Sequence, residues 1–178
     1  MNNEVILTTD DHPYPYGRVT EYTLAALQKC QVKAVFFLIG ERVDQLPHLA
    51  RAIVNGGHVV GCHTQYHYSN NSVSTLQDIS QGCVTLTDRL DVKPRLFRPP
   101  GGNRTRELPK QLATLGMTMM LWHVSVPNTP DVEAVVQEVL DCKETPCIIN
   151  MHTPWQVIEP LYRRLTDMGY KFVLPKGP

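Results

Sequence analysis

The sequence predicts an α/β fold in which parallel strands are connected by helices. Seven short apolar or β-branched runs recur along the 178 residues, and longer amphipathic stretches separate most of them. Because consecutive parallel strands need a helical crossover, this alternation leaves a barrel or a doubly wound open sheet as the candidate architectures. No phosphate-binding glycine-rich turn follows the first run, which speaks against the dinucleotide-binding form of the open sheet.

The expected strands are residues 5–9, 34–39, 58–62, 96–97, 118–122, 147–151 and 172–174. Several of the segments between them begin with residues that start helices. Ser74 with Gln77 fits the capping box, as does Thr153 with Gln156, and Thr129 followed by Pro130 offers an N-cap with proline in the first turn. The sequence therefore predicts helices that begin at these positions.

Length and composition narrow the classes of function. A chain of 178 residues fits one domain, taken here as residues 1–178. Lys and Arg number 17, Asp and Glu also 17, and no basic stripe is present, so nucleic acid is not an expected partner. Apolar stretches such as 35–39 are far shorter than the ~20 residues that span a bilayer, so no membrane insertion is expected.

The cysteines bear on the cellular compartment. Five cysteines without a C-x-x-C pair indicate reduced, structural thiols. This favours a cytoplasmic setting for the chain as written, with a secreted or periplasmic location as the alternative if a leader has been trimmed.

Polar side chains follow the expected strands at their carboxyl ends. They are Asp10 and Asp11 after the first strand, His63 after the third, Arg98 after the fourth, His123 after the fifth and His152 after the sixth. In parallel α/β folds the loops at this end of the sheet converge and carry the chemistry. The sequence therefore predicts one site there.

The stretch HTQYH at 63–67 indicates a metal site. It places His63 and His67 four residues apart, so that two imidazoles can face one point. In isolation this pattern is more often one packed and one solvent-exposed histidine. At a strand end shared with Asp10 and Asp11, the histidines and one carboxylate make the three ligands of a catalytic zinc-type site. The other carboxylate is then free to accept a proton.

Four motifs occur in order along the chain: TTDDHP at 8–13, HTQYH at 63–67, FRPPGG at 97–102 and INMH at 149–152. Together they resemble the polysaccharide deacetylase (NodB-homology) family, carbohydrate esterase family 4, and residues 33–40 and 169–175 are similar to family strands. The resemblance implies a distorted (β/α)7-type barrel. It also implies metal-dependent hydrolysis of an N-acyl amino sugar, with zinc as the expected ion and cobalt or nickel as alternatives.

The resemblance also implies roles for individual residues. The metal ligands would be Asp11, His63 and His67; the general base would be Asp10, paired with Arg98; and the acid that protonates the leaving amine would be His152. Gly101, through a backbone N–H near the oxyanion, Pro100, Trp122 and Asn150 would contact the substrate. Tyr14, Tyr16, Tyr66, Tyr68 and Trp155 suit stacking on sugar rings.

Two departures from the family pattern concern the first and fourth motifs. Thr9 and His12 stand where the family usually has Phe and Gly, and His12 is expected to be a solvated turn residue or a substrate contact. Ser125 and Asn128 replace acidic residues after the strand-end tryptophan. The acid histidine would then lack the carboxylate that tunes it.

A third departure concerns the acyl group. Asn150 replaces a leucine that lines the pocket for the acetyl methyl, and a polar amide in an apolar pocket costs about 1–3 kcal/mol unless it finds a partner. A formyl or a more polar acyl group is therefore open. In a competing alignment, shifted by one residue, Met151 forms the apolar wall.

Three functions follow from these residues. The first is a metal-dependent deacylase of an N-acyl amino sugar, such as an N-acetylglucosamine-containing glycan. The second keeps the metal scaffold but acts on another C–N bond, such as that of an N-formyl amino sugar or a small cyclic amide. The third is a glycan-binding relative without turnover, which the presence of Asp10, Arg98 and His152 together speaks against.

Overall fold

The structure, a computed structural model, describes residues 3–68 and 74–176. The strands are β1 (Glu4–His12), β2 (Val35–Leu38), β3 (Val59–Cys62), β4 (Leu96–Phe97), β5 (Thr118–Met119), β6 (Val124–Ser125), β7 (Cys147–Met151) and β8 (Lys171–Phe172). The helices are α1 (Val19–Cys30), α2 (Gly40–Gln45), α3 (Pro47–Asn55), α4 (Leu76–Leu90), α5 (Leu108–Thr114), α6 (Val132–Asp141) and α7 (Ile158–Asp167). Two short 3₁₀ turns cover Pro100–Gly102 and Trp155–Val157.

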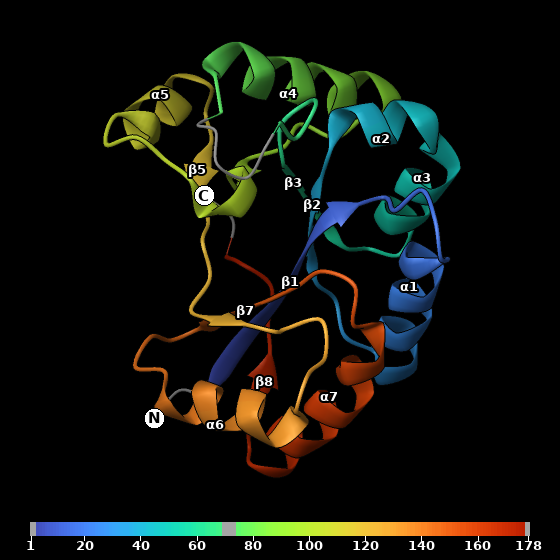
Figure 1. Ribbon diagram of the computed structural model, residues 1–178, viewed down its shortest axis with the longest axis vertical. Coiled ribbons are helices and arrows are strands. Elements are labelled where there is room, and N and C mark those ends of the chain that lie inside the picture. The colour runs from blue at the N-terminus through green and yellow to red at the C-terminus, as the bar shows by residue number, and fades with distance from the viewer. Residues whose placement is uncertain (1–2, 69–73, 177–178) are drawn as a thin grey trace.

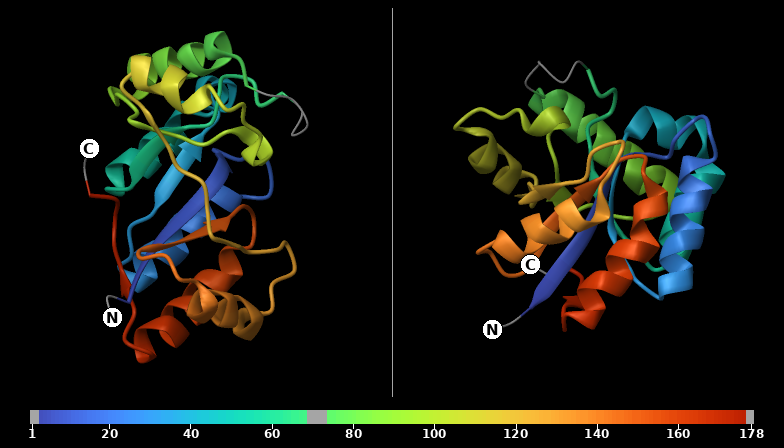
Figure 2. Two further views of the ribbon diagram at one scale, coloured as in Figure 1. Left: turned by 90° about the vertical axis from the view of Figure 1, so that its left-hand side faces the viewer. Right: turned by 60° about the horizontal axis from the view of Figure 1, so that its bottom comes forward.

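The strands form one parallel sheet that curls into a half-barrel with the helices outside it (Figures 1 and 2). The order across the sheet is β5-β4-β3-β2-β1-β7-β6, and β8 pairs with the first residues of β1. This confirms the distorted (β/α)7-type barrel and excludes the doubly wound open sheet. Among the described residues, no helix is both long enough and apolar enough to cross a membrane.

The predicted strand at 118–122 was too long. Strand β5 ends at Met119, and a separate strand, β6, follows at Val124–Ser125. Each pairs through only two residues, β5 with β4 and β6 with β7. A two-residue ladder leaves no alternation in the sequence, so the apolar run alone could not show where one strand ends and the next begins.

The predicted helix starts were displaced by one or a few residues. Helix α4 is capped by Thr75, whose side chain accepts a hydrogen bond from the Asp78 N–H, and not by Ser74. Helix α6 is capped by Asp131, which accepts from the N–H groups of the second and third helical residues, and not by Thr129. In both places the hydroxyl or carboxylate nearest to the free N–H groups forms the cap. A 3₁₀ turn without a side-chain cap precedes α7, where a capping box at Thr153 was predicted.

The side chains of β1 point alternately into two layers of the apolar core. Ile6 packs inside the half-barrel with Val35 and Phe37 of β2 in a small apolar cluster. Val5 and Leu7 face the other way, into the larger core between the sheet and the helices. Because side chains alternate along a strand, Asp10 shares the inner face with Ile6 and rises above this apolar base.

Helices cover the outer face of the sheet in contacting pairs: α2 packs on α4, α1 on α7, and α6 on α7. This layer supplies most of the apolar core and leaves the carboxyl ends of the strands free for side chains. All five cysteines are free thiols, as the sequence predicted.

Candidate active site

The carboxyl ends of β1, β3, β4 and β7 bring most of the predicted polar residues together. Asp10 and Asp11 lie among the last three residues of β1. Three more polar residues directly follow β3, β4 and β7, namely His63, Arg98 and His152. His123 does not lie with them, so its predicted place at this end of the sheet was wrong. It precedes β6 and exchanges hydrogen bonds with Ile148, the second residue of β7, near the opposite end of the sheet.

Asp11, His63 and His67 form a candidate metal centre. Asp11 Oδ1 lies 3.0 Å from His67 Nε2 and 3.4 Å from His63 Nε2, and the ligand atoms lie within 4.8 Å of one another. Among the described residues, this buried carboxylate oxygen has no hydrogen-bond partner of good geometry. His63 Nδ1 lies 2.6 Å from the Arg98 carbonyl oxygen, which can only accept, so the ring proton sits on Nδ1. Nε2 therefore presents its lone pair, as a metal-binding histidine must.

The backbone around this centre is held in an uncommon conformation. Asp11, Thr64 and His67 all have positive φ angles of 66°, 70° and 49°, a region that residues with a side chain rarely occupy. Local bonds hold it: Thr64 Oγ1 accepts from the His67 N–H at 3.0 Å, and the Arg42 guanidinium donates to the Asp11 carbonyl. Strain of this kind is typical of functional sites.

The electrostatics of the site keep the Asp11 carboxylate ionised. Burial alone would raise the pKa of Asp11, but the two close imidazoles outweigh it and hold that pKa well below its usual range. Burial alone would lower the pKa of His67, but Asp11 raises it. The carboxylate is thus ionised and ready to bind a cation, and a proton on His67 competes for the same place.

Asp10 faces away from the metal ligands into a buried hydrogen-bond ring. Its Oδ1 accepts from Arg98 Nη1 at 2.8 Å, and its Oδ2 accepts from Asn150 Nδ2 at 2.9 Å. The ring closes because Arg98 Nη1 also lies 2.8 Å from Asn150 Oδ1. Thr8, two residues before Asp10 on the same strand face, accepts from Arg98 Nη1 at 2.7 Å. The arrangement orients both carboxylate oxygens of Asp10.

Arg98 is fully buried and held on every side. Its Nε donates to the Met120 carbonyl and its Nη2 to the Leu121 carbonyl, both at 2.9 Å. The guanidinium carbon lies 4.2 Å from the Phe37 ring centroid and 5.4 Å from that of Trp122. A charge placed this deeply is stable only when it is paired and its N–H groups are bonded.

His152 lies beside Asp10 and faces solvent. Its Nε2 is 3.8 Å from Asp10 Oδ2, and its side chain is 38% exposed. Asn128, which replaces an acidic residue of the family, accepts a hydrogen bond from Thr153 Oγ1 at 3.2 Å. A histidine in this position can reach both the base and a substrate entering from solvent.

His12 is neither a solvated turn residue nor a substrate contact, so that prediction was wrong. It is completely buried, with Nε2 3.0 Å from Thr9 Oγ1 and Nδ1 3.0 Å from Thr20 Oγ1, and its ring lies 4.9 Å from Phe36. Burial lowers the pKa of His12 to about 3, so the ring is neutral. Thr9 and His12 thus replace the family's Phe and Gly as a bonded pair.

The loop after β4 approaches Trp122. Gly101 has a positive φ of 61°, and Pro100 is buried. At Gly102 an added Cβ would lie 3.1 Å from Trp122 Cη2, so the loop is packed against the indole. The oxyanion role of Gly101 and the substrate roles of Pro100 and Trp122 stay predictions.

The aromatic residues predicted to stack on sugars fall into two groups. Tyr16, Tyr66 and Tyr68 are exposed, and the last two flank His67 with their ring centroids 5.5 Å apart. Tyr14 is buried, and Trp155 packs on Tyr22. The exposed tyrosines are therefore the better placed for a glycan.

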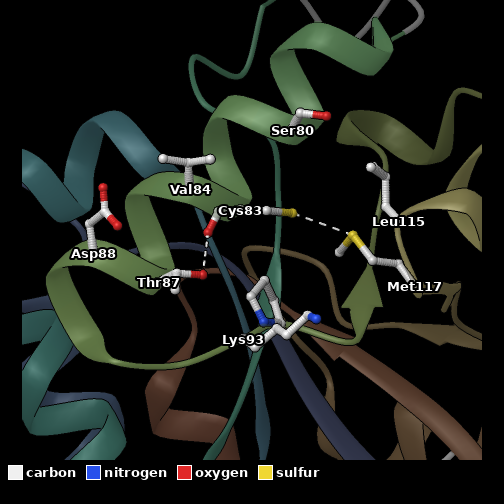
Figure 3. Close-up of a pocket in the computed structure, with 9 residues that line it drawn as sticks. Ser80, Cys83, Val84, Thr87, Asp88, Lys93, Leu115 and Met117 are labelled. Atoms are coloured by element: carbon white, nitrogen blue, oxygen red, sulfur yellow. Dashed lines mark hydrogen bonds between the residues drawn. The ribbon is translucent and has the colours of Figure 1, made fainter.

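An apolar hollow of about 290 Å³ lies apart from the polar centre, between α4 and the segment that leads into β5 (Figure 3). Cys83 and Met117 point toward one another across it, with their sulfur atoms 3.4 Å apart. None of the residues predicted for the site lines this hollow.

Comparison with known proteins agrees with this geometry. Residues 2–120 match the family described as polysaccharide deacetylase, and the chain belongs to that family. It is 32% identical, over 97% of its length and 87% of the relative's, to a peptidoglycan-N-acetylglucosamine deacetylase of Bacillus cereus. It is 29% identical over 97% of its length to peptidoglycan-N-acetylglucosamine deacetylase PgdA of Listeria monocytogenes.

Among solved structures, the fold matches a mutant of BA3943 of Bacillus anthracis, described as a CE4 family pseudoenzyme with restored enzymatic activity. The TM-score is 0.83 at 26% identity over 96% of this chain. The chain spans 65% of that structure and 38% of the Listeria relative. Because the CE4 family includes a protein described as a pseudoenzyme, membership alone does not establish activity. The residues of the site must decide it.

Proposed function

We propose that this protein is a metal-dependent deacetylase that removes the acetyl group from an N-acetylated amino sugar of a glycan, and that residues 1–178 act as one catalytic domain. One observation carries the proposal: the adjacent carboxylates Asp10 and Asp11 point to different partners. Asp11 faces His63 and His67, whereas Asp10 is bonded to Arg98. A ligand and a base are thus supplied side by side.

The donor set fits a divalent ion, and zinc is the ion that we propose. Two imidazole nitrogens and one carboxylate oxygen are the ligands that a catalytic zinc prefers, with positions left for water and substrate. When bound, the ion supplies a Lewis acid that polarises the acyl carbonyl and activates water. His63, His67 and Asp11 would hold the ion.

The residues of the chain divide the proton transfers between them. Asp10 takes the proton from the attacking water, while Arg98 and Asn150 fix its two oxygens. His152, exposed and 3.8 Å from Asp10, gives a proton to the amine as the C–N bond breaks. An amine is a poor leaving group unless it is protonated, so this step needs a positioned acid.

The contacts of Asn150 favour acetyl over formyl as the acyl group. Both ends of its amide are bonded inside the protein, to Asp10 and to Arg98, so it does not need a polar substrate to satisfy it. The named activity of the Bacillus and Listeria relatives supports N-acetylglucosamine in peptidoglycan as the substrate class. A glycan-binding protein without turnover remains the outcome to exclude.

The test is product release. The protein is stripped of metal with a chelator, reloaded with zinc, cobalt or nickel, and incubated with chitooligosaccharides, peptidoglycan fragments and N-formyl amino sugars. We expect acetate release that depends on the added ion. Formate release in its place would assign the second C–N hydrolase function, and glycan binding without either product would show a non-catalytic protein.

A further inference from the structure

A second cluster of metal-binding side chains lies outside the candidate active site. His123, Cys142 and Cys147 each offer one ligand atom, and these atoms all lie within 4.8 Å of one another. Cys147 is buried, Cys142 is half-buried and His123 is exposed. None of these residues contributes to the deacetylase mechanism proposed above.

The fold brings the three side chains together from separate segments. Cys142 follows the last residue of α6, and Cys147 is the first residue of β7. His123 is fixed beside them because its N–H donates to the Ile148 carbonyl and its Nδ1 accepts from the Ile148 N–H, both at 2.9 Å. The cluster therefore sits at the start of β7, whereas His152 follows the end of that strand, roughly 16 Å away.

The space around the two sulfur atoms is open to a small ion. A cavity of about 230 Å³ is lined by both cysteines and by polar groups that include Glu4 and Glu144. Two thiols and one imidazole form a soft donor set, which suits zinc, cadmium or copper(I) rather than magnesium or calcium. Three protein ligands with room for a water complete a tetrahedral shell.

We propose that His123, Cys142 and Cys147 form a second cation site, for zinc or another thiophilic ion, distinct from the deacetylase centre. On binding, both thiols lose their protons to solvent and the two thiolates and the imidazole bind the ion. The Ile148 N–H then gives up its bond to His123 Nδ1; this bond lies at the surface, where water can replace the ring. The thiolates consequently carry most of the affinity, and the imidazole adds to it.

Cadmium is the probe that separates this site from the active site. Cadmium–thiolate bonds give an ultraviolet charge-transfer band, and no sulfur atom belongs to the Asp11, His63 and His67 set. Titration of the wild-type protein, reduced with a phosphine, should saturate this band at one cadmium ion per chain. The double variant His63→Ala, His67→Ala should keep the band, whatever happens to deacetylation.

Matched cysteine variants assign the ligands. Cys142→Ser, at a half-buried position, should abolish the band, and His123→Ala should weaken cadmium binding at least tenfold. Cys83→Ser is the control because Cys83, which lies on α4 and contacts Met117, is away from the cluster, and it should keep the band (Figure 3). Circular dichroism should show that all the variants are folded, and acetate release by Cys142→Ser should equal that of the wild type.

Two results would overturn the proposal. One is a wild-type protein without the charge-transfer band when reduced. The other is a band that Cys83→Ser removes and Cys142→Ser keeps, which would place cadmium at another cysteine. If the first result is found, a mass loss of two hydrogens in air that Cys142→Ser prevents would show that the two thiols form a disulfide instead of a metal site.

Discussion

Asn150 and Asp10 lie on paired strands and are joined by a buried hydrogen bond of 2.9 Å from Asn150 Nδ2 to Asp10 Oδ2. The other end of the same amide accepts from Arg98, which also binds Asp10. We therefore propose that Asn150 is a positioning residue for the proposed base, and not the substrate contact that the family resemblance implied.

Replacing Asn150 with leucine tests this role. Asn150→Leu removes a hydrogen bond to a charged carboxylate, worth about 1.5–3 kcal/mol, so we expect kcat to fall roughly 10- to 100-fold. KM and metal content should change little, because no metal ligand is touched. The control Asn55→Leu, at the exposed end of α3, should leave kcat unchanged. An unchanged kcat in Asn150→Leu would show that the ring does not serve catalysis.

His152 can be tested through the leaving group. His152→Ala should lower hydrolysis of the sugar amide about 10²-fold or more, because the amine then leaves without a positioned acid. Hydrolysis of an activated aryl acetate, whose phenolate leaves unaided, should fall far less. Initial rates on both substrates give the comparison, and Asp10→Asn should lower both. Equal losses on both substrates in His152→Ala would remove the acid role.

Buried His12 predicts a pH dependence of stability. Its pKa falls from 6.5 in the unfolded chain to about 3 in the folded one, so the unfolded state binds more protons below pH 6.5. Stability contributed by His12 is therefore present above pH 6.5 and is lost, by up to about 1.4 kcal/mol per pH unit, as the pH falls toward 3. Urea unfolding of the metal-free proteins gives the free energy of unfolding between pH 7 and 4.5. This free energy should fall less steeply with decreasing pH in His12→Gln than in the wild type. An equal pH dependence of the free energy of unfolding in the two proteins would contradict a lowered pKa of His12.

Metal binding should weaken in acid. Asp11 raises the pKa of His67 in the metal-free protein, so protons compete for this ligand at a higher pH than for an ordinary histidine. We expect the zinc affinity to drop about tenfold per pH unit for each proton taken up. Equilibrium dialysis of Cys142→Ser, which lacks the proposed second cation site, measures this affinity at several pH values. An affinity independent of pH from 5.5 to 7.5 would argue against histidine ligands.

Much of the fold could be predicted because its signals are local and repeated. Alternating apolar runs and amphipathic stretches predict parallel strands with helical crossovers, and the polar residues after β1, β3, β4 and β7 share one end of the sheet. The short strands β5 and β6 could not be separated in this way. His123 was misplaced for that reason, since its position depends on where β6 begins.

The site was predictable in its residue types and less so in its contacts. The ring that joins Asp10, Arg98 and Asn150 depends on strand pairing between residues 140 positions apart, which no local pattern contains. Side chains two residues apart on a strand share a face, and this spacing was the available signal that Thr8 lies beside Asp10. His12 was expected in solvent because its neighbours are turn residues, but packing against Phe36 and the bond to Thr20 bury it.

The division of labour between Asp10 and Asp11 is the central claim, and paired metal analysis and kinetics on two variants test it most directly. In a Cys142→Ser background, which removes the proposed second cation site, Asp10→Asn should keep one zinc ion per chain, as the Cys142→Ser parent should, while kcat for acetate release falls by roughly 10² or more. Asp11→Asn should lose the zinc, and with it the activity. If Asp10→Asn loses the metal while Asp11→Asn keeps it, or if Asp10→Asn retains full activity, the account is contradicted.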